Sequence, residues 1–296
     1  MAGLVPAISL RRALLCPPDR DRRDKPGDDS ENAMSPDLYF ALTLIVKMAV
    51  TAGFLLVATV TAERAGPLIG GLVATLPISA GPVYIFLALD HDAHFIAQGA
   101  LGSLVTNALN VLFAVTYALL AQKRSLPVCL GGAFATWLAL SLATGAVAWT
   151  LPLAIAFNVV IIALSLWVVH PLRHVRVAAV QTRWYDLVLR AGMVAVLVGV
   201  VVTLSFTIGA AASGSLAVFP IVLSSIMIIL HRRIGGPATA AIMANAVVGL
   251  GGFAVAVITL CVTAERLGSP LALALALAVS VGCNMLIYLV RRMAAA

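Results

Sequence analysis

The sequence predicts an all-α fold, a polytopic transmembrane helix bundle of about nine spans. Nine apolar runs, most about 20 residues long, fill the chain between Leu38 and Val290. About 20 apolar residues in a helix cross a hydrocarbon layer of roughly 30 Å. Hydrophobic residues make up 62% of the chain and charged residues 10%, which is far from the usual composition of soluble domains. A water-soluble domain could not bury this much apolar surface.

The segment before the first run has a different composition. Met1–Pro36 is rich in charge, proline and glycine, and such a segment buries too little apolar surface to form a core. The apolar stretch before Arg11 is too short and broken for a secretion signal. The strings "MAGLVPAI" and "RDKPGDD" resemble a translated repeat element found ahead of over-extended bacterial reading frames. We therefore expect residues 1–33 to be disordered and Met34 to be the start; a basic regulatory tail is the alternative.

Each apolar run is expected to form one membrane-spanning helix. The first five spans make up a first half, residues 34–176, and the last four make up a second half, residues 177–296. The third and eighth spans are long enough to tilt. The fourth and fifth are separated only by a very short connection before Pro152. The predicted spans cover residues 38–62, 68–89, 95–121, 127–149, 152–170, 186–208, 211–230, 237–263 and 270–290.

Lysine and arginine residues concentrate on one side of this arrangement. Beyond Met34, the opposite side carries Arg266 alone. Positive residues stay in the cytoplasm, so we expect a bacterial inner-membrane protein with its N-terminus outside and its C-terminus in the cytoplasm. The formal net charge of +7 then reflects membrane orientation and not nucleic-acid binding. The residues on the basic side are Arg64, Lys123, Arg124, Arg173, Arg176, Arg183, Arg232, Arg233, Arg291 and Arg292.

The chain resembles itself when it is shifted so that Lys47 aligns with Arg190. The two copies begin five spans apart, so they cross the membrane in opposite directions, as the inverted repeats of secondary transporters do. A short gap in the 90–98 loop then aligns Asn107 with Asn245. Chance recurrence of glycine and proline is the alternative. The other aligned pairs are Gly66 and Gly209, Gly71 and Gly214, Ala74 and Ala217, Pro77 and Pro220, and Ile78 and Ile221.

Proline and glycine interrupt the second and seventh spans at matching positions. A proline removes a backbone donor and clashes with the preceding turn, and lipid offers no partner for the carbonyls that are freed. Paired broken helices point to a binding site near the midplane, whereas a packed kink is the alternative. The candidate substrate-binding residues at the two breaks are Thr75, Pro77, Ser79, Gly214, Pro220 and Ser224.

Lys47 is a further candidate for substrate binding. It lies about nine residues into the first span, where a charge costs about 3 kcal/mol on insertion scales. It could bind an anionic group, carry a proton, or pair with carbonyls freed at Pro77; snorkelling to the surface is the alternative. Arg190 is expected to pair with Asp186, one helical turn earlier.

Two asparagines complete the candidate site. Asn107 and Asn245 are aligned by the repeat, so we expect them to line the site, although an amide in lipid also often joins two helices. The loop Asp90–His94 carries groups that bind metals but is expected to be solvated. The four cysteines have no metal-ligand spacing. We therefore expect no metal, no cofactor and, without a catalytic motif, no enzyme activity.

The second half, from about Asp186 to Arg292, resembles the GlpM-like membrane proteins. It shares an early cation at Arg190, the string "GSLAVFPIVLSS" over residues 214–225, and a final apolar hairpin. The resemblance implies a polytopic inner-membrane protein and no particular substrate, and the chain departs from the family in being doubled.

These observations favour a secondary transporter of a small solute, with an anionic solute as one option. The alternative is a non-transporting scaffold or assembly subunit for envelope biosynthesis. The expected partners are the lipid bilayer and a small-molecule solute, with assembly into a homo-oligomer left open and no nucleic acid.

Overall fold

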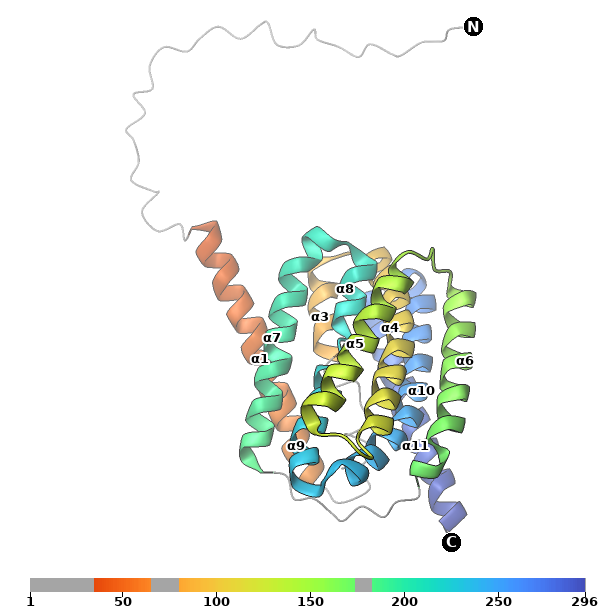
Figure 1. The fold of residues 1–296 in the computed structure, drawn as a ribbon. Helices are drawn as coiled ribbons and strands as arrows, with labels where there is room; N and C mark the ends of the chain where they lie inside the picture. The colour runs from red at the N-terminus through yellow and green to blue at the C-terminus, as the bar shows by residue number, and fades with distance from the viewer. Residues whose placement is uncertain (1–34, 65–79, 174–182, 296) are drawn as a thin grey trace, which may run out of the picture. The chain divides into compact units, whose positions relative to one another are not determined.

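The computed structural model describes residues 35–64, 80–173 and 183–295, and this part of the chain contains helices and no strands. Residues 41–296 form one compact unit; of the other, residues 1–40, the structure describes only the start of the first helix. The helices are α1 (Pro36–Arg64), α3 (Ala80–Asp90), α4 (Ala93–Leu120), α5 (Leu126–Gly145), α6 (Leu151–Val169), the 3₁₀ helix η1 (His170–Leu172), α7 (Trp184–Ile208), α8 (Ala210–Ala217), α9 (Ile221–Ile234), α10 (Gly236–Leu267) and α11 (Ser269–Ala295) (Figure 1).

The predicted helical membrane fold is confirmed. Within the described residues, eight helical segments are long and apolar enough to cross a bilayer, and each coincides with a predicted span. Helices α8 and α9 together form the seventh span, and α5 and α6 are separate helices. Of the predicted second span, 68–89, the structure describes only the part from Ala80, where the shorter apolar helix α3 lies.

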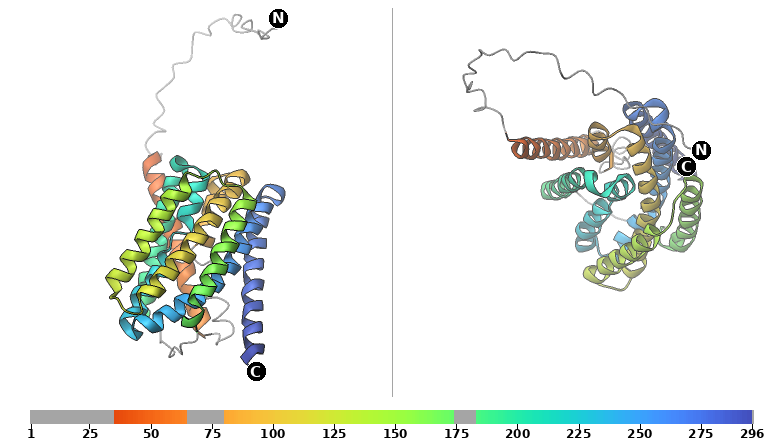
Figure 2. Two further views of the ribbon diagram at one scale, coloured as in Figure 1. Left: turned by 45° about the vertical axis from the view of Figure 1, so that its right-hand side comes forward. Right: turned by 90° about the horizontal axis from the view of Figure 1, so that it is seen from above.

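Helix α4 is the most enclosed of the spans, with 78% of its apolar window buried. It packs against α5, α6, α8 and α10, which lie around it in the view from above in Figure 2. Its start is fixed by Asp92, whose side chain accepts a hydrogen bond from the Phe95 backbone N–H at 2.8 Å. This N-cap satisfies a donor that the first turn leaves unpaired. Helix α4 therefore provides the frame around which the candidate site residues are arranged.

The outward faces of the peripheral helices are apolar. Leu142 on α5 and Trp167 on α6 are 72% and 79% exposed, respectively. A soluble monomer rarely presents such extensive apolar surface, whereas hydrocarbon covers it at no cost. The bilayer is therefore the environment that these helices require.

Two helix starts of the first half recur in the second half at the shift that aligns Lys47 with Arg190, whereas the starts of α1 and α7 do not follow it. The same shift relates the start of α4 at Ala93 to the start of α10 at Gly236, and the start of α5 at Leu126 to the start of α11 at Ser269. We call this shift the repeat offset. These two starts need no gap in the 90–98 loop, where one was expected from the sequence, and the repeat itself stays a prediction. Without that gap, Asn107 is equivalent to Leu250, 143 residues later, and no longer to Asn245.

Helix α4 begins at one end of the bundle and ends at the other. Residues 91–92 precede α4, whereas the end of α9 lies beside the end of α4, where the Tyr117 hydroxyl and His231 Nδ1 are 2.7 Å apart. Lys123 and Arg124 follow α4 at this second end, and Arg233 lies in the last turn of α9 there (Figure 1). The basic residues of these connections therefore share one end.

Candidate functional site

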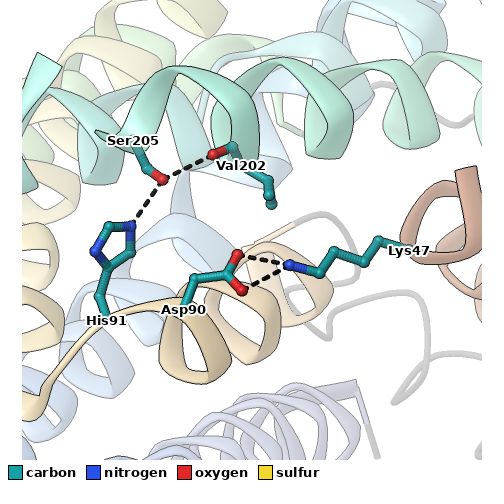
Figure 3. A network of polar contacts seen from close by, with 5 residues as sticks. All are labelled: Lys47, Asp90, His91, Val202 and Ser205. Carbon is teal, nitrogen blue, oxygen red and sulfur yellow. Dashed lines mark hydrogen bonds and ion pairs between the residues drawn. The ribbon is translucent and has the colours of Figure 1, made fainter. Parts of the chain in front are cut away.

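Lys47 forms an ion pair with Asp90. Its Nζ lies 2.6 Å from Oδ2 and 2.8 Å from Oδ1 of Asp90, which ends α3 (Figure 3). The two side chains are only 13% and 19% exposed, and Nζ lies 5.8 Å from the centre of the Phe86 ring. The ion pair joins α1 to α3, and its partial burial limits screening by water and salt. An approaching anion would have to compete with Asp90 for Lys47.

His91 extends this polar group to α7. Its Nε2 lies 2.8 Å from Ser205 Oγ, and the Ser205 hydroxyl donates to the Val202 carbonyl at 2.8 Å (Figure 3). Since that hydroxyl proton is committed, His91 Nε2–H is the donor to Ser205. The imidazole also stacks on Phe95, with ring centres 3.8 Å apart. Burial lowers the pKa of His91 below its ordinary value of 6.5, although Asp90 and Asp92 act in the opposite direction.

The loop at residues 90–94 is therefore only partly a solvated connection, and that expectation is wrong for Asp90 and His91. His94 fits it better: its Nδ1 lies 2.7 Å from Glu265 Oε1, with the side chains 69% and 54% exposed. No group of three or more His, Cys, Asp or Glu side chains suited to a metal ion occurs among the described residues.

A second ion pair joins α7 to α9 at the other end of the bundle. Arg233 NH1 and NH2 donate to the two carboxylate oxygens of Asp186 at 2.6 and 2.7 Å, a bidentate geometry that fixes orientation as well as charge. The Arg183 backbone N–H also donates to Asp186 Oδ2, at 2.9 Å. Arg190, which the sequence pairs with Asp186, adds electrostatic attraction to that carboxylate, but Arg233 supplies the bidentate contact.

Asn107 lies where α4 meets α6 and α10. It is fully buried, and its Nδ2 donates to Asn158 Oδ1 at 3.0 Å and to the Leu250 carbonyl at 3.2 Å. Its Oδ1 has no hydrogen-bond partner within the part of the chain that the structure describes. Asn245 lies elsewhere on α10 and donates to the Ala241 carbonyl at 2.9 Å. The structure does not bring these two asparagines together.

The break between α8 and α9 is closed by polar side chains of the protein itself. Asn110 Nδ2 donates to the Val218 carbonyl at 2.7 Å, and Asn110 Oδ1 accepts from Trp137 Nε1 at 2.9 Å. The Ser224 hydroxyl donates to the Pro220 carbonyl at 2.6 Å. Carbonyls freed by the proline break thus find partners without lipid, as membrane proteins require. In the sequence, only the polarity of Asn110 within an apolar span pointed to this role.

Gly214 lies at a close contact between α8 and α4. Its carbonyl accepts from the Ser103 hydroxyl at 2.6 Å, and Ser103 Oγ accepts in turn from the Tyr84 hydroxyl at 2.6 Å. A Cβ at Gly214 would overlap the backbone of Gly99. Small residues allow this kind of approach between membrane helices. Gly214 therefore holds two helices together, and its role in substrate binding stays a prediction, as it does for Pro220, Ser224, Asn107 and Asn245.

Three candidates of the predicted second span, Thr75, Pro77 and Ser79, lie outside the described residues. Their role as substrate ligands stays a prediction.

A cavity of about 290 Å³ lies between α1, α3, α10 and α11. Apolar side chains from all four helices line it, and none of the described candidates from the sequence is among the lining residues. Phe86 and Thr51 belong to the lining, and both contact Lys47: Phe86 lies beneath its Nζ, and the Thr51 hydroxyl donates to the Lys47 carbonyl at 2.8 Å. The Lys47–Asp90 pair therefore borders this cavity.

Sequence reasoning did not identify Asp90, His91 or Arg233 as partners. Each partner lies far away along the chain, so helical periodicity gave no signal for it. The repeat offset does make Asp90 equivalent to Arg233. A charged residue at each of these two aligned positions would have marked both as candidates for ion pairs.

Comparison with protein families, curated proteins and solved structures finds no match. The resemblance to GlpM-like proteins thus stays an expectation based on the motif.

Proposed function

We propose that this chain is a secondary transporter of a small solute, built from two halves that form an inverted repeat. One observation carries the proposal: each half has an ion pair between two of its helices, Lys47–Asp90 or Asp186–Arg233, and the repeat offset aligns Asp90 with Arg233. Lys47–Asp90 joins α1 to the end of α3, just before α4. Asp186–Arg233 joins α7 to the last turn of α9, just before α10. Secondary transporters commonly place such inverted halves around one central path.

The helix boundaries support the same symmetry. Helices α4 and α10 begin at positions related by the repeat offset, as do α5 and α11. Asn107 donates to the carbonyl of Leu250, its own equivalent at that offset. A contact between equivalent positions is expected where a pseudo-twofold axis passes between two helices. Two halves of opposite direction would place the two ion pairs on opposite sides of the membrane.

The end of the bundle that carries Lys123, Arg124 and Arg233 is proposed to face the cytoplasm, because positive connections are retained there. The protein would then lie in the bacterial inner membrane with its N-terminus outside. Lys47–Asp90 would close the outer side and Asp186–Arg233 the inner side. Alternating access requires one side to open while the other stays closed, and a partly buried ion pair suits such a reversible closure.

Transport is tested with the full chain in reconstituted vesicles, by screening small organic anions with solid-supported-membrane electrophysiology. We expect Lys47→Ala to abolish the transport current at unchanged protein level, because the ion pair with Asp90 is lost. Lys123→Ala is the matched control, since Lys123 is exposed at the opposite end, and it should retain the current.

Transport that survives Lys47→Ala contradicts this mechanism. A stable protein partner that co-purifies with the chain, together with indifference to Lys47, would instead favour the scaffold role in envelope biosynthesis. The double variant Lys47→Asp with Asp90→Lys separates charge from folding, because it restores the ion pair in reverse.

A further inference from the structure

The cavity between α1, α3, α10 and α11 has the size and lining of a ligand site. Its volume of about 290 Å³ is close to the lower end, about 300 Å³, of the usual range for small-molecule sites. Lining residues such as Phe54 and Ile85 are 54% and 52% exposed, so the cavity opens to the surrounding bilayer. Its lining is almost wholly apolar, and the hydroxyls of Thr51 and Tyr84 are hydrogen-bonded within the protein, so little is left to hold water. Its natural occupant is therefore an apolar group.

Small residues keep this space open. At the repeat offset, Ala256 in the cavity wall is equivalent to Phe113, and Leu277 is equivalent to Phe134. Phe113 on α4 and Phe134 on α5 pack edge to face, with ring centres 5.0 Å apart, in a core cluster that fills the space between α4, α5 and α9. The space beside α10 and α11 is therefore hollow, whereas the equivalent space beside α4 and α5 is filled.

Charge is present at one border of the cavity. Phe86 belongs to the cavity wall and also lies 5.8 Å from Lys47 Nζ. Lys47 is held by a carboxylate, that of Asp90. A ligand that carries its own carboxylate could replace Asp90 at Lys47 and keep the cation paired, and charge-assisted bonds of this kind are the strong ones.

We propose that this cavity binds a single-chain amphiphile, with its apolar tail between the four helices and its carboxylate at Lys47. The volume fits one short tail and not the two tails of a phospholipid. The claim that this ligand is a transported substrate rests on the proposed function. The claim that the cavity binds the ligand does not depend on that function. Asp90 is then the internal competitor of the ligand, and Lys47 is the residue that selects an anionic head.

The test is saturable photolabelling of the full chain in lipid nanodiscs, with a diazirine-bearing analogue of decanoate as the probe. We expect decanoate to compete with the probe, and decanol and acetate to compete at least about tenfold more weakly, because each lacks one of the two features that the site recognises. Labelled positions should fall on cavity residues such as Phe54 and Phe253.

Charge variants test the head of the ligand. Lys47→Gln should weaken decanoate binding by about tenfold or more, whereas Lys47→Arg should retain most of it. Asp90→Asn should strengthen decanoate binding, because the competing carboxylate is removed. A purely structural ion pair would not produce this gain. Each variant is compared at matched monodispersity, and Lys47→Arg keeps the test informative if Lys47→Gln does not fold.

Two alanines of α11 provide a matched pair for the tail. Ala276 lines the cavity and is buried, whereas Ala278 is exposed two residues later. Ala276→Phe should abolish saturable labelling, and Ala278→Phe should leave it unchanged.

Several outcomes would overturn the inference. These are labelling that does not saturate, labelling outside the cavity, equal competition by decanol and decanoate, or binding that is indifferent to Lys47→Gln. Decanoate binding without any decanoate transport in vesicles would retain the site and contradict its role as a transport site. Transport of another solute, in a protein that does not bind decanoate, would contradict the inference and leave the proposed function standing.

Discussion

Asp90 and Arg233 are equivalent at the repeat offset, and each connects the end of its helix to the first helix of its half through an ion pair. The charges are reversed: Asp90 accepts from Lys47, whereas Arg233 donates to Asp186. The residue equivalent to Lys47 is Arg190, one turn beyond Asp186 on α7. In the second half the acid therefore lies on α7 and the base on α9. In the first half the base lies on α1 and the acid on α3. One ion pair joins α1 to α3 and the other joins α7 to α9, with opposite polarity.

Breaking the second ion pair should destabilise the protein. Asp186 is 3% exposed, so Asp186→Asn leaves Arg233 and Arg190 without the carboxylate that compensates them, and removal of one partner from a buried pair is the costly change. We expect a clear fall in melting temperature, measured by light scattering and intrinsic fluorescence in detergent. The double variant Asp186→Arg with Arg233→Asp should recover part of it.

Glu265→Gln is the control for this prediction. Its pair with His94 is exposed on both sides, and exposed pairs contribute at most about 1 kcal/mol. An equal loss of stability in Glu265→Gln and Asp186→Asn would show that the burial of Asp186 does not increase the contribution of its ion pair to stability.

The span pattern was predictable because it is local. Apolar runs and proline positions define helices α4 to α11 to within a few residues, since bilayer thickness dictates helix length. Asp186 shows where this reasoning ends. Its turn neighbour Arg190 was the expected partner, but Arg233, 47 residues away, makes the bidentate contact. Contacts between helices depend on rotation and tilt, which periodicity does not encode. Asp90 was missed for the same reason.

The position of Gly214 shows a different limit. Its alignment with Gly71 and its place in the same interrupted span as Pro220 pointed to a ligand site. The structure shows that it packs closely against α4, and the ligand role stays a prediction. Small residues serve both purposes in membrane helices, and sequence alone does not distinguish them. The repeat offset was the more informative signal, because it also makes Asp90 equivalent to Arg233.

Acid should destabilise the fold around His91, because it charges a partly buried imidazole ring. Burial lowers the pKa of His91 below 6.5, so the folded protein binds fewer protons than the unfolded chain, and its contribution to stability is present above about pH 6.5 and lost as pH falls. We expect His91→Gln to flatten the decline of melting temperature between about pH 8 and about pH 5. Asp90, Asp92 and Lys47 also act on His91; an identical pH profile in the variant would assign the decline to them.

Replacing Gly214 tests the close contact between α8 and α4. A methyl group in Gly214→Ala would overlap the Gly99 backbone, and overpacking of this kind costs about 1–3 kcal/mol. Gly251→Ala in α10 is the control, because nothing lies within 4 Å of the added carbon. It should be neutral or slightly stabilising, since alanine favours helix by about 1 kcal/mol. Unfolding in mixed micelles measures both, and similar values for the two would contradict the packing role.

Asn110 should be needed to close the break between α8 and α9. Asn110→Leu keeps the approximate size of the side chain but leaves the Val218 carbonyl and Trp137 Nε1 unpaired. Each unsatisfied buried group costs about 1–3 kcal/mol. We therefore expect a loss in that range or above it, together with a changed Trp137 environment in near-ultraviolet circular dichroism. A stable variant with an unchanged spectrum would show that other groups close the break.

Side-specific labelling tests the orientation that the basic residues predict. In a chain with its four cysteines replaced, His94→Cys and Arg232→Cys each add one exposed thiol, at opposite ends of the bundle. In intact cells, a membrane-impermeant maleimide should label the thiol at position 94 and reach the one at 232 only after permeabilisation, because positive connections remain in the cytoplasm. The reverse pattern would invert the protein in the membrane and exchange the sides of the two ion pairs. Labelling of both thiols from one side would contradict the opposite directions of the two halves, and with them the inverted repeat on which the transport proposal depends.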